Sequence, residues 1–205
     1  MKSKSILAAV CVLSLLFSLS VPALASESPF SDVKPEDYFY ESVLWAYENQ
    51  ITAGTGGDQF SPNRHCTRAQ VVTFLWRASG QPEPAVSDIP FNDVPEDAYY
   101  HTAVLWAVEQ GITAGTDATH FSPNAKCSRS QVATFLWRLE GCPEPQAQEC
   151  PFFDIAQGDF YYNAVLWAVE QNITAGTGNN SFSPQANCSR AQIVTFLYRA
   201  MADNV

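Results

Sequence analysis

Positively charged residues are scarce in this chain. Its 205 residues contain 11 lysines and arginines against 21 acidic residues, for a net charge of −10 at pH 7. Nucleic acids and anionic membranes are both bound through a basic surface, because each presents many negative charges. The composition therefore excludes nucleic-acid binding and argues against an anionic lipid surface as a partner.

The sequence also lacks the common motifs of catalysis and metal binding. No G-x-S-x-G, no H-E-x-x-H and no phosphate-binding loop occurs. A zinc site would need C-x-x-C spacing or histidines at fixed offsets, and the three histidines occupy non-equivalent positions in the repeats described below. We therefore expect no catalytic residue, no metal site and no cofactor.

No apolar run after residue 25 approaches the ~18 residues that span a membrane. The N-terminus, in contrast, carries Lys2 and Lys4, an apolar core from Ile6 to Leu19, and an A-x-A cleavage signal that ends at Ala25. These features predict a secretory signal peptide over residues 1–25. Its removal leaves nine cations, 21 carboxylates and a net charge of −12. We expect an exported protein without membrane insertion.

Five of the six cysteines lie beyond the signal peptide, an odd number that cannot all pair within the chain. Cys142 and Cys150 lie in one proline-rich loop and could form a disulfide. Export permits oxidation without requiring it, so both states stay open.

The dominant signal is internal repetition with a period of 61 residues. Connectors rich in proline and glycine, "ASGQPEPAVSDIP" and "LEGCPEPQAQECP", separate the copies. We assign the repeats to residues 26–88, 89–149 and 150–205. The recurring residues include Asp32, Asp93 and Asp154; Trp45, Trp106 and Trp167; Gly54, Gly115 and Gly176; Phe60, Phe121 and Phe182; and Arg77, Arg138 and Arg199.

Each repeat is predicted to hold two helices joined by a long loop. The first helix carries "VLWA" and ends near Gln50, Gly111 or Asn172, where glycine and asparagine suit a left-handed cap. The second runs through "TFLWR" or "TFLYR" with a helical apolar stripe. Two such helices cannot bury their apolar faces alone, so the copies must share a core.

The three copies are equally amphipathic, whereas an open solenoid needs polar caps at its ends. We therefore predict a mainly α fold in which three helix-loop-helix repeats close with pseudo-threefold symmetry. The tryptophan-bearing helices are expected near the common axis. Their helical spacing indicates that the tryptophans and the "FLW" aromatics form core rather than sugar platforms.

The motif "CTRAQ", which returns as "CSRSQ" and "CSRAQ", predicts the start of each second helix. Thr67 and Gln70 have the spacing of a capping box, and Cys66 with Val71 has that of a hydrophobic staple. The cysteines of the motif are therefore expected to be buried apolar groups rather than metal ligands. The equivalent residues are Ser128 with Gln131, Ser189 with Gln192, Cys127 and Cys188.

Capping does not explain the arginine of this motif. An arginine at the first helical position faces the positive end of the helix dipole. Either an acidic residue of the protein neutralises it, or the guanidinium and the free helix N–H groups form a site for a carboxylate or phosphate. The residues concerned are Arg68, Arg129 and Arg190, whereas Arg77, Arg138 and Arg199 lie near helix C-termini, where a cation is favourable.

The linked motifs "F-x-D-V", "V-L-W-A", "I-T-A-G-T", "F-S-P" and "[ST]-R-[AS]-Q" resemble the S-layer homology domain in its usual set of three, over residues 30 to about 200. The resemblance implies a three-pronged spindle around a central helical bundle. It also implies grooves that bind secondary cell-wall polysaccharide bearing a pyruvate ketal. Arg68, Arg129 and Arg190 would contact the pyruvyl carboxylate, and Gly54, Gly115 and Gly176 would lie near the groove. A turn with positive φ is the alternative reason for these glycines.

Two positions depart from the family pattern. The glutamate that usually follows the arginine is glutamine here, which keeps the capping geometry and removes a charge beside the guanidinium. The residue before the motif, commonly Ile or Val, is cysteine in all three copies, in agreement with the staple.

Together these features predict a secreted, cell-wall-associated anchoring module that is not an enzyme. Its expected partners are the polysaccharide and surface-layer proteins. The alternatives are a structural protein–protein interaction or surface-layer assembly module and, less favoured, a polysaccharide-acting enzyme that uses Asp32, Asp93 and Asp154. Those aspartates more simply cap or pin the entry to the first helix. The substitution Arg129→Ala is expected to weaken wall binding without unfolding the module.

Overall fold

The structure is a computed structural model that describes residues 28–202. The predicted signal peptide lies outside these residues. Six helices form the regular structure of the described part, where strand-like pairing is limited to isolated bridges. None of these helices is long and apolar enough to cross a membrane. In chain order they are α1 (Tyr40–Glu48), α2 (Arg68–Ala78), α3 (His101–Glu109), α4 (Arg129–Leu139), α5 (Tyr162–Glu170) and α6 (Arg190–Met201).

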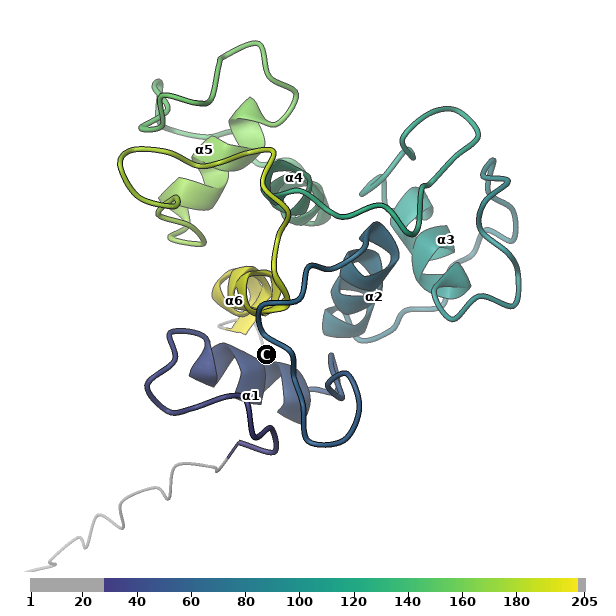
Figure 1. Cartoon of the computed structure of the whole chain (residues 1–205). Helices are drawn as coiled ribbons and strands as arrows, with labels where there is room; N and C mark the ends of the chain where they lie inside the picture. Colours follow the sequence, from purple (N-terminus) through teal and green to yellow (C-terminus); the bar gives the residue numbers. More distant parts are fainter. Residues whose placement is uncertain (1–27, 203–205) are drawn as a thin grey trace, which may run out of the picture.

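The helices form three prongs around a centre (Figure 1). The second helix of each repeat packs against the first helix of the next, so that α2 pairs with α3, α4 with α5, and α6 with α1. The last pair joins the two ends of the chain and closes the ring. The predicted closed pseudo-threefold arrangement is therefore confirmed.

The expected position of the tryptophan-bearing helices is wrong. Helices α2, α4 and α6 surround the axis, and α1, α3 and α5, which carry Trp45, Trp106 and Trp167, lie outside them (Figure 1). Loops cover the outer side of each first helix: Phe30 packs on Tyr47 of α1 and on Phe60, with ring centroids 5.5 and 5.6 Å apart. Because these loops complete the burial, the first helices need no place at the axis.

The tryptophans belong to the core, as their spacing predicts. Trp106 and Trp167 are buried, and Trp45, Trp76 and Trp137 are partly buried against the main cluster of apolar side chains. That cluster draws residues from all three repeats, which confirms that the copies share a core.

The first helices end in the left-handed cap that the sequence predicts. At the end of α1, Gln50 has φ = 59°, and its N–H donates to the carbonyl of Tyr47 at 3.0 Å. The N–H of Ile51 donates to the carbonyl of Ala46 at 2.8 Å, which completes a Schellman motif. Gly111 and Asn172 have φ values of 68° and 57° at the equivalent positions.

The motif cysteines meet at the pseudo-threefold axis. The N–H of Cys66 donates to Cys188 O at 3.3 Å, that of Cys127 to Cys66 O at 3.0 Å, and that of Cys188 to Cys127 O at 2.9 Å. These bonds form a closed ring that ties the starts of the three central helices together. All three side chains are fully buried free thiols, in agreement with the predicted staple.

Cys142 and Cys150 are also free thiols, so the disulfide that the sequence permits is not formed in this structure. Cys142 is exposed, and its N–H donates to the carbonyl of Trp137 at 2.9 Å, which fixes it at the end of α4. Cys150 is half-buried beside the apolar cluster of the third repeat.

Candidate functional site

Each second helix begins with a complete capping box. The hydroxyl of Thr67 accepts from the N–H of Gln70 at 3.3 Å, and the Gln70 side chain accepts from the N–H of Thr67 at 3.0 Å. Ser128 with Gln131 and Ser189 with Gln192 repeat this geometry. The cap places Arg68, Arg129 and Arg190 at the first helical position, as predicted.

The three arginines reach across the junction between repeats instead of extending into solvent. The Nε of Arg68 donates to Phe121 O at 2.8 Å, and its guanidinium lies over the rings of Phe121 and Phe135, 4.9 and 5.4 Å from their centroids. Arg129 and Arg190 make the same bond, at 2.8 Å, to the carbonyls of Phe182 and Phe60. Their side chains are only 3–4% exposed. Each arginine therefore joins one repeat to the next.

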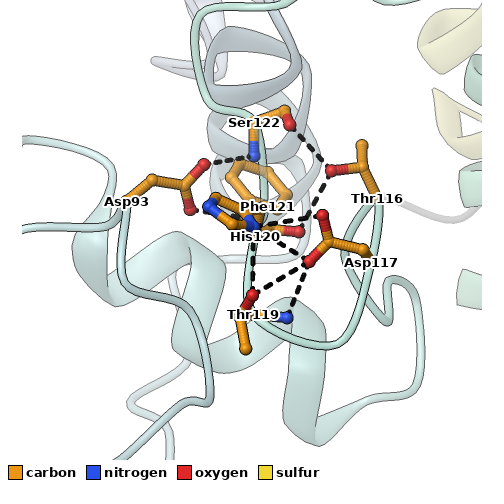
Figure 2. Close-up of polar contacts among 7 residues, drawn as sticks. All are labelled: Asp93, Thr116, Asp117, Thr119, His120, Phe121 and Ser122. Atoms are coloured by element: carbon orange, nitrogen blue, oxygen red, sulfur yellow. Dashed lines mark hydrogen bonds and ion pairs between the residues drawn. The ribbon is translucent and has the colours of Figure 1, made fainter.

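A carboxylate compensates each guanidinium through one peptide group. Asp93 accepts from the N–H groups of Phe121 and Ser122 at 2.8 Å each (Figure 2). The Ser122 N–H belongs to the same peptide group as the Phe121 carbonyl that accepts from Arg68. Anion and cation thus polarise that group from opposite sides. Asp32 and Asp154 act in the same way on residues 60–61 and 182–183.

This geometry contradicts a direct ion pair with an acid of the protein and leaves the site for an external anion as a prediction. Within residues 28–202 the only ion pair links Asp117 and His120, so no arginine pairs directly with an acid. The prediction that the repeated aspartates cap or pin the entry to the first helix is wrong, because they hold the "F-S-P" loop that precedes the second helix.

The repeated glycines are required by the backbone. Gly54, Gly115 and Gly176 have φ values of 84°, 86° and 84°. A Cβ at Gly115 would lie 2.5 Å from the carbonyl oxygen of His120 and 2.5 Å from the ring of Phe91. The turn with positive φ is therefore confirmed. Gly115 and Gly176 also line the grooves described next.

Two grooves open beside the buried arginines. The groove between the first and second repeats, the 1–2 groove, has a volume of about 360 Å³ and is lined by Arg68, Gly115, Arg138 and Phe160, among others. The groove between the second and third repeats, the 2–3 groove, has a volume of about 400 Å³ and is lined by Arg129, Gly176, Arg199 and Tyr38. Each holds two arginines, and no acidic side chain of the described residues lines either.

The third junction, between the third and first repeats, is called the 3–1 groove. It brings the Arg190 guanidinium to Thr52 and Gly54, and Nη2 donates to Thr52 Oγ1 at 3.1 Å and to Gly54 O at 3.5 Å. Thr52 and Arg77 also line a neighbouring cavity of about 550 Å³, which includes the acidic Glu48 and is not lined by Arg190.

Sequence reasoning missed three members of this site. The second arginine, assigned only to the helix dipole, donates to a loop carbonyl and lines the groove: Arg138 Nη1 lies 3.1 Å from Ile112 O. Both threonines of "ITAGT" line the groove in the second and third repeats. The third member is an exposed aromatic residue two positions before each first helix, which lines the 1–2 and 2–3 grooves; its 61-residue recurrence was the signal that could have found it. These aromatics are Tyr38, Tyr99 and Phe160, which are 66%, 65% and 67% exposed.

The environment of the buried groups keeps the thiols neutral. Burial lowers the pKa of all three guanidinium groups, while the neighbouring cysteines and aspartates oppose that shift. Burial also raises the pKa of Cys66 to about 11 and that of Cys127 to about 12. The charge presented to the grooves is therefore that of the arginines alone.

The departure from glutamate to glutamine has a structural meaning. Gln131 and Gln192 complete the capping boxes and also line the two grooves. A glutamate there would place a carboxylate in the same cavity as the arginines. Glutamine therefore leaves the positive potential of the groove uncompensated.

The loop of the second repeat carries an additional polar cluster. Asp117 pairs with Nδ1 of His120 at 2.9 Å and accepts from the N–H of Thr119 at 2.8 Å (Figure 2). The N–H of Thr116 donates to the carbonyl of His120 at 2.8 Å. The pair thus braces the loop that carries Gly115. Among the described residues no group of His, Cys, Asp or Glu side chains could hold a metal ion.

The burial of Arg129 changes the expectation for Arg129→Ala. Its side chain joins the second repeat to the carbonyl and ring of Phe182 in the third. Removing it would therefore weaken the junction as well as the groove, so exposed rim residues are better reporters of binding.

Comparison with known sequences identifies the same three repeats and the family that they resemble. The S-layer homology domain model matches residues 29–72, 90–133 and 151–194. An endoglucanase of Bacillus sp. (strain KSM-635) is 31% identical over 92% of this chain and 21% of its own length. The Surface-layer 125 kDa protein of Lysinibacillus sphaericus is 33% identical over 68% and 12%, respectively. A cellulosome-anchoring protein of Acetivibrio thermocellus is 24% identical over 72% and 34%.

The chain thus spans about a third or less of these relatives. The enzyme-named relatives match it only over the S-layer homology part of a larger protein. The S-layer and cell-surface relatives indicate a cell-surface, cell-wall-associated location. Three family matches, in register with the repeats and covering more than half of the sequence, show that the chain belongs to the S-layer homology domain family.

Proposed function

We propose that this chain is a non-catalytic anchoring module that binds an anionic, pyruvylated secondary cell-wall polysaccharide in the grooves between its repeats. The observation that carries the proposal is the pair of arginine-lined grooves. A protein with 21 acidic residues places two arginines and no described carboxylate in each of two cavities of sugar size.

The chemistry of these grooves suits a carboxylated sugar. A guanidinium offers directed N–H donors that match the geometry of a carboxylate. Rim aromatics offer an apolar face against which a sugar ring can pack. The loop glycine brings backbone close to the same space, because it has no side chain. Each groove therefore combines a charge contact, an apolar contact and backbone donors or acceptors.

The net negative charge of the protein makes this recognition local. An acidic protein repels an anionic polymer at long range, so attraction begins only where the two guanidinium groups dominate the potential. Several grooves on one module then increase the avidity for a polymer whose acidic sugar repeats, because binding in one groove raises the effective concentration at the next.

The test is a pull-down with purified cell walls in three states: intact, chemically stripped of polysaccharide, and with the pyruvate removed. The proposal predicts that the protein sediments with intact walls and stays in solution in the other two states. Binding that survives stripping would replace the polysaccharide with peptidoglycan or a protein as the partner. Sustained release of reducing ends from the polysaccharide would make the chain an enzyme.

A matched pair of variants ties the binding to the grooves. The triple variant Tyr38→Ala, Tyr99→Ala, Phe160→Ala removes the exposed aromatic at the same position of each repeat, which lines a groove in two of them. Phe153→Ala removes another exposed ring that lines neither groove. We expect the triple variant to lose wall binding at unchanged helical content by circular dichroism. Phe153→Ala should bind as the unsubstituted protein does.

A further inference from the structure

The three junctions have the same arginine Nε–carbonyl hydrogen bond but differ in the partners of the terminal nitrogen Nη2. In the 3–1 groove, Nη2 of Arg190 makes two bonds within the protein, to Thr52 Oγ1 at 3.1 Å and to Gly54 O at 3.5 Å. In the 1–2 groove, Nη2 of Arg68 makes one long bond, to Thr113 Oγ1 at 3.5 Å. In the 2–3 groove, Nη2 of Arg129 is buried and has no hydrogen-bond partner.

An unpaired buried donor changes what a ligand gains on binding. Leaving a charged N–H group buried without an acceptor costs free energy, and an incoming carboxylate oxygen that accepts from it removes that cost. In the other two junctions a ligand must compete with a threonine hydroxyl that already accepts. The gain from the same carboxylate is therefore largest at Arg129 and smallest at Arg190.

The rim of the 2–3 groove reinforces this difference. Tyr38 lines the cavity together with Arg129 and Arg199, and both arginines act electrostatically on its hydroxyl. The equivalent residue of the 1–2 groove is Phe160, which has no hydroxyl. The 2–3 groove thus offers a phenol and two guanidinium groups, contributed by all three repeats.

We propose that the three grooves are not equivalent, and that the 2–3 groove is the principal site for the carboxylate-bearing sugar while the 3–1 groove is the weakest. This inference rests on the proposed function and adds which groove is filled first. The buried, unpartnered nitrogen of Arg129 is the feature that distinguishes the 2–3 groove from its two counterparts.

The experiment is isothermal titration of the protein with a monosaccharide methyl glycoside that carries a pyruvate ketal. Tyr38→Ala, Phe160→Ala and Tyr99→Ala are matched single variants, because each removes a rim aromatic of similar exposure. Tyr38 lines the 2–3 groove and Phe160 the 1–2 groove, while Tyr99 occupies the equivalent repeat position, where Arg77 acts electrostatically on its hydroxyl. We expect one tight site, weakened about tenfold by Tyr38→Ala. The other two variants should leave the affinity of that site unchanged within about twofold.

The variant Phe160→Tyr distinguishes the contribution of the Arg129 nitrogen to affinity from that of the Tyr38 hydroxyl. If the free nitrogen of Arg129 determines the ranking, a new hydroxyl in the 1–2 groove leaves that groove weaker than the 2–3 groove. A second site of equal affinity in Phe160→Tyr would overturn the inference, as would equal losses in the three alanine variants. If the unsubstituted protein binds neither the glycoside nor the polysaccharide, the proposed function itself fails.

Discussion

At the scale of single residues, the site depends on how a few charges are neutralised. Three arginines are buried at helix starts, where the helix dipole opposes them, and each is stabilised by a carbonyl whose peptide group is held by an aspartate. The aspartate therefore contributes to the position of the guanidinium without touching it. Its carboxylate acts on the groove through a loop, at the distance of one peptide group.

Replacing this aspartate should loosen both the loop and the groove. In Asp93→Asn the amide can no longer accept from both Phe121 and Ser122 N–H groups. We expect a loss of about 1–3 kcal/mol in the free energy of unfolding, because a partly buried N–H is left unpaired. Chemical denaturation measures this loss, and Glu96→Gln, at an exposed position nearby, serves as the control. A loss no greater than that of the control would show that Asp93 does not stabilise the loop whose carbonyl accepts from Arg68.

The Asp117–His120 pair predicts a local pH dependence. The hydrogen bond to Asp117 raises the pKa of His120 above 6.5, and the Thr119 N–H lowers the pKa of Asp117 to about 2. The contribution of His120 is therefore complete below about pH 6.5 and is lost as pH rises through its raised pKa. That of Asp117 is present above about pH 3.8 and is lost as pH falls toward 2.

An NMR titration of the His120 imidazole tests this dependence. Asp117→Asn should bring the pKa of His120 back toward 6.5, because the charged partner is removed. An identical titration curve in both proteins would show that the pair does not form in solution.

Residue roles were only partly predictable from the sequence. The arginine, the glycine and the capping pair were identified because they recur every 61 residues within recognisable local motifs. The contacts that link Asp93 to Arg68 through the peptide group between Phe121 and Ser122 join positions far apart in the chain and in different repeats. No local sequence pattern therefore reveals them. The rim aromatics were overlooked because an aromatic residue that directly follows one of them in the sequence, Tyr161, belongs to the core.

At the scale of elements, helix ends were the most predictable feature. Capping boxes and left-handed C-terminal positions follow from local hydrogen bonding, which the sequence specifies directly. The packing of the helices is not local: both helices of a repeat are amphipathic, and the sequence does not say which one has its outer side covered by loops. For that reason the tryptophan-bearing first helices, rather than the second helices, were predicted to lie at the axis.

The helix C-terminus offers a matched pair of stability variants. Gln50 and Gly111 occupy the same left-handed position at the ends of α1 and α3. Gln50→Gly should raise the free energy of unfolding by about 0.5–1 kcal/mol, because the conformation is strained for a residue with a side chain. Gly111→Ala should lower it by about 1 kcal/mol through the backbone alone, since nothing lies within 4 Å of the new Cβ.

Gly115→Ala is the informative comparison. Its φ is similar to that of Gly111, but the new Cβ would lie 2.5 Å from a carbonyl oxygen and an aromatic ring. We expect a larger loss of stability than for Gly111→Ala, together with weaker binding in the 1–2 groove. Equal melting temperatures for the two variants would show that the loop adapts freely.

At the scale of the whole molecule, the repeats depend on one another. The second helix of each repeat packs on the first helix of the next repeat, and α6 of the third repeat packs on α1 of the first (Figure 1). Each junction arginine also joins two repeats, so a groove exists only when both repeats are folded. The equal amphipathicity of the copies predicted this closure, whereas the exchange of partners between neighbouring repeats could not be predicted from it.

Closure predicts a single cooperative unfolding transition. Far-UV circular dichroism and tryptophan fluorescence should give coincident melting curves, because the apolar core is shared. A chain that ends at residue 149 lacks α5 and α6 and leaves both α1 and α4 without their partners. We expect it to lose cooperative unfolding. A truncated chain that melts as sharply as the whole protein would mean that the repeats fold independently.

The most direct test is a crystal structure with a pyruvylated disaccharide. We expect the ketal carboxylate in the 2–3 groove, with an oxygen about 2.7–3.2 Å from a terminal nitrogen of Arg129. A sugar bound on a surface away from Arg68, Arg129 and Arg190 would contradict it.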